Sequence, residues 1–312
     1  MALDEATTRL LARLAAQPGR RPIHECTPRE AREQNAALSL LLAPGPSMAR
    51  SEDHRIGAGD EAFTVRLLVP AVQVRGVIVY YHGGGWVFGD LDGFDSLGRA
   101  LAERTGCAVV LAGYRLAPEH RFPAAVEDAW RTLLWAESQR QRIAGRRVPL
   151  IVAGDSAGGN LAAVAALRAR DENGPQIALQ LLVYPVTDCS MATASYQDPA
   201  NQLVISRASM AWFWDRYIPD PACRSQAWAS PLRASTLKGL PPAEVLTAEH
   251  DVLRDEGEEY ARHLHEAGVP VRLRRFAGQM HGFFTLVGLL PGNEEGLDHA
   301  AEAISRRLAE LG

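Results

Sequence analysis

The sequence has few cysteines, no long apolar run and no excess of positive charge. Its four cysteines are scattered and include no Cys-x-x-Cys pair, which favours free thiols over a disulfide scaffold: Cys26, Cys107, Cys189 and Cys223. No apolar run approaches the roughly 18 residues that a membrane span requires. The net charge of −4 offers no basic surface for nucleic acid. These absences leave a globular protein whose partner is expected to be a small molecule.

Two further absences concern the location of the protein and its cofactors. The N-terminus has early acids, Asp4 and Glu5, and lacks the basic start and apolar core of a secretion signal, so we expect a cytoplasmic location. No phosphate-binding Gly-x-x-x-x-Gly-Lys loop occurs. His263 and His265 lie two apart on a predicted helix and point to different faces, which argues against a shared metal. At 312 residues and 47% hydrophobic, the chain is long enough for a catalytic domain and a cap.

A Gly-Asp-Ser-Ala-Gly-Gly segment occupies residues 154–159. In a Gly-x-Ser-x-Gly motif the serine stands at a sharp turn between a strand and a helix, and a side chain at either flanking glycine would collide with its surroundings. The apolar run 148–153 is typical of a buried strand, and 161–170 is typical of a helix. The order of strand, turn and helix predicts that Ser156 is a nucleophile.

A His-Gly-Gly-Gly segment follows a predicted central strand, 77–81. Attack on an ester carbonyl builds negative charge on its oxygen, which fixed backbone N–H donors can stabilise. A glycine run lets the backbone turn its amides toward that oxygen. We predict that the amides of Gly83, Gly84 and Ala157 form this oxyanion hole, with Gly85 as a further candidate donor.

The acid and base of a serine triad are expected downstream of Ser156, in the order nucleophile, acid, histidine. Asp251 lies just past a predicted strand, 244–248, and ligand-facing groups sit at such strand ends. His281 lies in the loop beyond the next predicted strand, 269–276. Chain order therefore predicts Asp251 as the acid and His281 as the base.

Two other residues compete for these roles. Asp255 follows the same predicted strand as Asp251, but it should lie a turn into the helix predicted from about residue 253 to 267. His250 adjoins Asp251 but falls at the wrong place in the chain order. Asp155 and Asp188 are interpreted as residues that hold loops by hydrogen bonds.

With both glycine motifs in place, the chain resembles the hormone-sensitive lipase group of α/β-hydrolases, the bacterial carboxylesterases of the His-Gly-Gly-Gly type. Further segments are similar to the family's: 114–120, 122–125, 184–188 and 253–257. The resemblance implies an α/β fold, a mostly parallel eight-stranded sheet flanked by helices, with a helical cap. Val252 and Arg121 stand where the family often has proline. Neither departure removes a reacting group.

The resemblance also implies the reaction. Ser156, Asp251 and His281 fall on the family's triad positions, so an acyl-enzyme on Ser156 is expected, hydrolysed by water, with no metal and no organic cofactor. Family members are often dimers through an edge strand, which here would be the strand at 269–276. Gel filtration would test that expectation.

Two segments lie outside the alternation of strands and helices. Residues 1–45 have the apolar spacing of two amphipathic helices, and 189–230 holds a cluster of aromatic residues. We predict that both form a cap over a catalytic core of residues 46–188 and 231–312. Trp86 and Val87, beside the glycine loop, and Trp212, in the second segment, are candidates for the substrate pocket. By family analogy, such a cap favours short- to medium-chain esters.

Two alternative functions remain open at this point. The same triad could serve a lactonase, an amidase or a peptidase, and the sequence does not separate these from an esterase. A different class is a non-catalytic ligand-binding protein, because plant gibberellin receptors resemble this family but have lost the catalytic histidine. The presence of His281 favours an enzyme.

Overall fold

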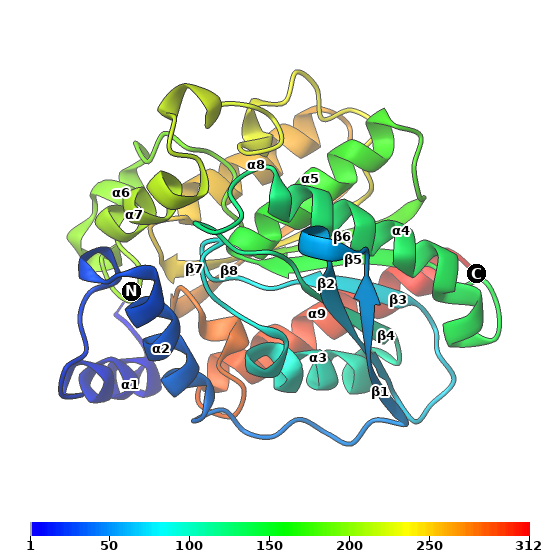
Figure 1. Ribbon diagram of the computed structural model, residues 1–312, viewed down its shortest axis with the longest axis horizontal. Helices are drawn as coiled ribbons and strands as arrows, with labels where there is room; N and C mark the ends of the chain where they lie inside the picture. The colour runs from blue at the N-terminus through cyan, green and yellow to red at the C-terminus, as the bar shows by residue number, and fades with distance from the viewer. Residues whose placement is uncertain (1) are drawn as a thin grey trace.

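A sheet of eight strands forms the centre of the molecule (Figure 1). The structure is a computed structural model that describes residues 2–312. The strands lie in the spatial order β1-β2-β4-β3-β5-β6-β7-β8; β2 is antiparallel to both of its neighbours, and all other pairs are parallel. Their bounds are β1 Arg50–Ile56, β2 Phe63–Val69, β3 Val77–Tyr81, β4 Ala108–Gly113, β5 Leu150–Asp155, β6 Ile177–Val183, β7 Ala243–His250 and β8 Val271–Met280. The predicted mostly parallel eight-stranded sheet is confirmed.

Helices cover both faces of the sheet. Figure 1 shows α3 and α9 on one face and α4, α5 and α8 on the other. Their bounds are α3 Leu91–Thr105, α4 Ala124–Ala144, α5 Ala157–Asp171, α8 Arg254–Glu266 and α9 Pro291–Glu310. Every residue of β3 is buried, because its side chains alternate between these two layers. Val79 packs in the cluster that includes Leu161 of α5, and Ile78 packs in the one that includes Leu101 of α3.

The N-terminal helices lie at the same end of the molecule as α6 and α7 (Figure 1). The helices concerned are α1 Glu5–Ala15, α2 Pro28–Ser39, α6 Ala194–Gln197 and α7 Arg207–Tyr217. Helix α2 begins at a capping box, in which the Thr27 hydroxyl accepts from the Glu30 amide and the Glu30 carboxylate accepts from the Thr27 amide. The Trp212 indole N–H of α7 donates to the carbonyl of Cys26 at 3.0 Å, which joins the two segments.

Short 3₁₀ turns complete the chain at Ile23–Glu25, Gly59–Glu61, Pro199–Asn201, Pro221–Cys223, Pro231–Arg233 and Phe283–Thr285. All four cysteines are free thiols, as predicted. Within residues 2–312, no helix combines the length and the apolar character needed to cross a membrane. Strands β1 and β8 are the two edges of the sheet.

Candidate active site

Ser156 occupies the tight turn between β5 and α5. Its backbone lies at φ 55°, ψ −119°, a region that a residue with a side chain rarely adopts. Two hydrogen bonds hold it there: the Ser156 amide donates to the carbonyl of Val183 at 2.9 Å, and its own carbonyl accepts from the amide of Val186 at 3.1 Å. The neighbouring strand β6 and its following loop therefore keep the serine in its strained position.

The glycines of the motif are required by close backbone contacts. A Cβ atom at Gly158 would lie 1.9 Å from the carbonyl oxygen of Tyr81, and one at Gly154 would lie 2.3 Å from the carbonyl oxygen of Gly158. Non-bonded carbon and oxygen atoms do not approach each other that closely, so neither position accepts a side chain without movement of the backbone. The predicted reason for these glycines is confirmed.

The structure brings Ser156, Asp251 and His281 together at the carboxyl ends of three parallel strands. His281 Nε2 lies 3.1 Å from Ser156 Oγ, and His281 Nδ1 lies 2.7 Å from Asp251 Oδ2. Asp251 follows β7, and its other carboxylate oxygen accepts from the Leu253 amide at 2.9 Å. Asp251 is fully buried and His281 is nearly so. With Nδ1 protonated toward the carboxylate, Nε2 is free to accept the serine proton.

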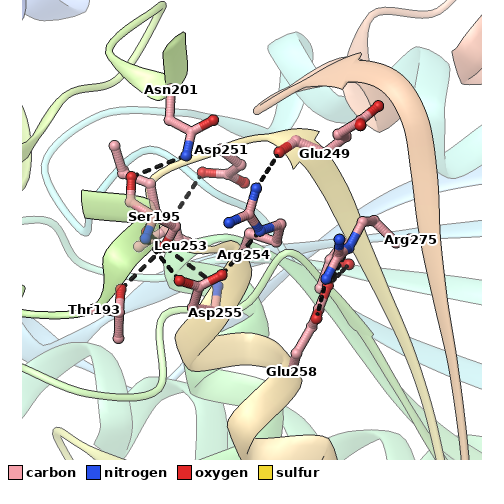
Figure 2. A network of polar contacts seen from close by, with 12 residues as sticks. Thr193, Ser195, Asn201, Glu249, Asp251, Leu253, Arg254, Asp255, Glu258 and Arg275 are labelled. Carbon is pink, nitrogen blue, oxygen red and sulfur yellow. Dashed lines mark hydrogen bonds and ion pairs between the residues drawn. The ribbon is translucent and has the colours of Figure 1, made fainter. Parts of the chain in front are cut away.

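Figure 2 shows why Asp255 does not compete with Asp251. The Asp255 carboxylate accepts from the backbone amide of Ser195 at 2.6 Å and from the guanidinium of Arg254 at 2.9 Å, so it is turned toward α6. The Ser195 hydroxyl donates to the carbonyl of Val252 at 2.6 Å, in the loop beside Asp251. Asp255 thus ties the 189–230 segment to the start of α8, and the acid beside His281 is Asp251.

The glycine loop after β3 differs from the prediction at one residue. The Gly83 amide donates to Asp155 Oδ1 at 2.9 Å, so this amide is not available to a substrate oxygen, and the predicted role of Gly83 is wrong. The error arises because the acceptor is the residue just before the serine, which chain order does not reveal as a neighbour of the loop. Within residues 2–312, the amides of Gly84, Gly85 and Ala157 have no hydrogen-bond acceptor.

The buried carboxylate of Asp155 and the ring of His82 both fix this loop. Burial raises the pKa of Asp155 to about 6, although its Oδ1 also accepts from the Tyr80 hydroxyl at 2.9 Å. Burial lowers the pKa of His82 to about 4, so its ring is neutral at pH 7 and Nδ1 donates to the Gly83 carbonyl at 2.7 Å. The loop-holding interpretation of Asp155 is confirmed, and so is that of Asp188, which pairs with Arg233.

A cavity of about 150 Å³ opens beside Ser156 and His281. Its walls come from the glycine loop, from α3 and α7 and from the N-terminal helices, and they are mainly apolar; among them are Leu14, Leu38, Phe88, Phe94, Met210 and Phe213. A Cβ atom at Gly85 would lie 2.1 Å from the ring of Phe213, so the loop and α7 are in close contact. The site therefore combines one polar side with an apolar wall.

The three predicted pocket residues do not line this cavity. Trp86 and Val87 are fully buried, and Trp86 stacks on the ring of Tyr217 with ring centroids 4.2 Å apart. Trp212 packs against the N-terminal segment through its bond to Cys26. Phe88 and Phe213, each one residue from a predicted position, line the cavity instead. The glycine loop indicated the first of these segments and aromatic content the second, but the phase of the backbone decides which side chain lines the cavity.

Comparisons with known proteins find similar sequences and structures among ester hydrolases. A family model described as the alpha/beta hydrolase fold matches residues 78–285. Carboxylesterase NlhH of Mycobacterium tuberculosis is 40% identical over 238 residues, which are 75% of this chain and 72% of that protein. An ethyl acetate hydrolase of Pseudomonas putida is 36% identical over 299 residues, or 92% of each chain. The crystal structure of a thermostable esterase from Pseudomonas putida is 36% identical, with a TM-score of 0.91 over 98% of both chains.

Proposed function

The chain belongs to the hormone-sensitive lipase group of the α/β-hydrolase fold family and is a carboxylic ester hydrolase, and from this premise we propose that it cleaves short- to medium-chain esters through an acyl-enzyme on Ser156. The observation that supports this most strongly is the chain of contacts from Ser156 Oγ through His281 to Asp251, at 3.1 Å and 2.7 Å.

In the proposed mechanism, Ser156 Oγ attacks the ester carbonyl while His281 Nε2 takes its proton. Asp251 keeps Nδ1 protonated and stabilises the positive charge that the ring gains. His281 then gives the proton to the leaving alcohol, and the acyl group remains on Ser156. A water molecule, deprotonated by His281 in the same way, attacks the acyl-enzyme and releases the acid.

The negative charge on the substrate carbonyl oxygen is stabilised by the amides of Gly84, Gly85 and Ala157. Each is a fixed donor with no partner among residues 2–312, and Ala157 is the first residue of α5, where helix amides are unpaired. Donors that are in place before the reaction need no reorganisation as charge develops, and one such donor is typically worth about 10²–10³ in rate.

We further propose that residues 1–45 and 189–230 act as a cap over the core formed by 46–188 and 231–312. Both segments contribute side chains to the cavity, Leu38 from the first and Phe213 from the second. The bond from Trp212 to Cys26 links them. A cap of this kind closes one side of the cavity and limits the length of chain that it accepts.

The small cavity supports a preference for short acyl chains. A volume of about 150 Å³ is below the range of roughly 300–1,000 Å³ typical of pockets that hold drug-sized ligands. One relative is named for its action on ethyl acetate, a small ester. These two observations favour small esters over long triglycerides as substrates.

A panel of p-nitrophenyl esters tests the proposed function. We expect the purified protein to hydrolyse the acetate and butyrate, and kcat/KM for the palmitate to be at least about tenfold below that for the butyrate, because the longer chain exceeds the cavity. A rate that increases from butyrate to palmitate would refute the chain-length preference. Failure of the folded protein to hydrolyse any ester would overturn the proposed function and favour lactones, amides or a binding role.

A further inference from the structure

A single arginine, Arg20, lines the catalytic cavity. It lies between α1 and α2, and it lines both this cavity and a neighbouring one that includes Gln17 and Glu30. Among the described residues that line the catalytic cavity, Arg20 is the only arginine or lysine. The one carboxylate in the lining, that of Asp155, is already bound by Tyr80 and by the Gly83 amide.

Few protein groups bind the guanidinium of Arg20. It makes one long hydrogen bond, 3.5 Å from Nη1 to Oε1 of Gln17, and it has no carboxylate within 4.0 Å in the described chain. A guanidinium has five N–H donors, so most of those of Arg20 are left to water or to a ligand. Partial burial lowers the pKa of Arg20 from its ordinary value, but arginine remains protonated in proteins.

The next residue, Arg21, has a different environment. Its guanidinium donates to the carbonyl of Glu25 at 2.6 Å and lies 3.7 Å from the Glu30 carboxylate. Arg21 is about half exposed and does not line the catalytic cavity. The two adjacent arginines therefore differ: Arg21 lies beside a carboxylate, whereas Arg20 has none within 4.0 Å and lines the catalytic cavity.

Contacts before and after the α1–α2 connection, which includes Arg20, hold the N-terminal segment against the site. The Arg32 guanidinium of α2 donates to the carbonyl of Val87 at 2.8 Å and to that of Ala117 at 3.0 Å, next to the glycine loop. At the other end, the Asp4 amide donates to the carbonyl of Gly278 at 3.0 Å, near the end of the strand that leads to His281. Arg20 is thus on a segment anchored to the elements that form the site.

We propose that Arg20 is a specificity-determining residue that binds a carboxylate of the substrate, so that the preferred substrates are esters with a free carboxylate group. This inference rests on the proposed esterase function. An arginine can bind a carboxylate through two parallel N–H···O bonds. The pair is stronger here than on an open surface, because Arg20 is partly removed from water. The carboxylate can belong to the acyl part or to the alcohol part of the ester.

Matched pairs of esters test this proposal. Mono-p-nitrophenyl glutarate against p-nitrophenyl pentanoate places the charge on the acyl side, and 3-acetoxypropanoate against butyl acetate places it on the alcohol side. We expect the wild type to prefer the charged member of one pair. Arg20→Gln should lower the ratio of kcat/KM for the charged ester to that for the neutral ester by about tenfold or more, mainly through KM of the charged ester.

Arg21→Gln is the matched control and should leave both members of each pair unchanged. Hydrolysis of the neutral ester shows that the Arg20→Gln protein is folded and active. The proposal is overturned if the ratio of charged to neutral rates is the same in wild type and Arg20→Gln, or if both rates fall together, which would show that Arg20 only supports its loop. Absence of hydrolysis of every ester by the wild type would be a different result, because it overturns the esterase function itself.

Discussion

Asp155 shows how one buried side chain can organise the donors of the site. Its Oδ1 takes the Gly83 amide at 2.9 Å, and the two following amides of the glycine loop are left without acceptors in the described chain. A Cβ atom at Gly83 would lie 2.2 Å from Asp155 Oδ2, so the loop packs directly on this carboxylate. We infer that Asp155, the residue before Ser156, positions the glycine loop.

Replacement of Asp155 tests this role. In Asp155→Ala the Gly83 amide loses its acceptor, so the loop is free to shift, and we expect kcat for p-nitrophenyl butyrate to fall about 10- to 100-fold with little change in KM. Asp155→Asn keeps an oxygen that can accept the same bond and should stay within about threefold of wild type. Circular dichroism at the assay temperature checks that both variants are folded. An Asp155→Ala enzyme with wild-type kcat would contradict the assignment.

The sequence predicted which three side chains come together better than it predicted their surroundings. Ser156, Asp251 and His281 could be found because motif and chain order restrict each to a few positions, and the structure brings the three together. The errors at Gly83, Trp86, Val87 and Trp212 have a different origin. They depend on which way an amide or a ring points, and contacts with residues distant in the chain decide that direction.

Helix α8 is tied to the loop after β6 by a buried acid, Glu256. Its Oε1 accepts from the amides of Thr187 and Asp188 at 2.7 Å and 3.3 Å, and the Thr187 hydroxyl donates to the carbonyl of Glu256 at 2.8 Å. Helix α8 directly follows the loop that holds Asp251, and the loop after β6 bonds the Ser156 backbone. Glu256 thus connects the helix that follows Asp251 to the loop that supports the Ser156 backbone.

The stability of this connection should depend on pH. Burial raises the pKa of Glu256 to about 8, above the value of 4.5 for an ordinary glutamate. The folded state therefore keeps a proton that the unfolded state loses, and the stabilisation from Glu256 is full below pH 4.5 and declines as pH rises toward 8. Glu256→Gln does not titrate and keeps an acceptor oxygen. We expect its free energy of unfolding, relative to wild type, to increase by on the order of a few kcal/mol from pH 5 to 8.

Urea unfolding of wild type and Glu256→Gln at several pH values between 5 and 8 measures the effect. Glu259→Gln, on the more exposed side of α8, is the control. A constant difference between Glu256→Gln and wild type across the range would contradict the raised pKa.

The strands around this connection were predicted well from apolar runs, and β3 has the predicted bounds 77–81. Strand β8 continues past its predicted end at residue 276 to Met280, because its backbone stays paired with β7 beyond Phe276.

The whole molecule assembles its site from segments that are far apart in the chain. The glycine loop, Ser156, Asp251 and His281 follow four strands of one parallel region, and the strand order places their carboxyl ends along one edge. Residues before the first strand and the 189–230 segment add the walls of the cavity. The family resemblance carried by the two glycine motifs implied this architecture, whereas the shape of the cavity depends on how the two added segments pack, which no local pattern of residues encodes.

Covalent labelling of Ser156 tests the central claim most directly. Diethyl p-nitrophenyl phosphate should phosphorylate an activated serine and release p-nitrophenolate. We expect one diethylphosphoryl group per chain, located by peptide mass spectrometry on Ser156, with ester hydrolysis lost in proportion. Ser156→Ala should remain unlabelled and hydrolyse p-nitrophenyl butyrate at least about 10³-fold more slowly than wild type. A label on another residue, or hydrolysis by Ser156→Ala close to the wild-type rate, would contradict the assignment of Ser156 as the nucleophile.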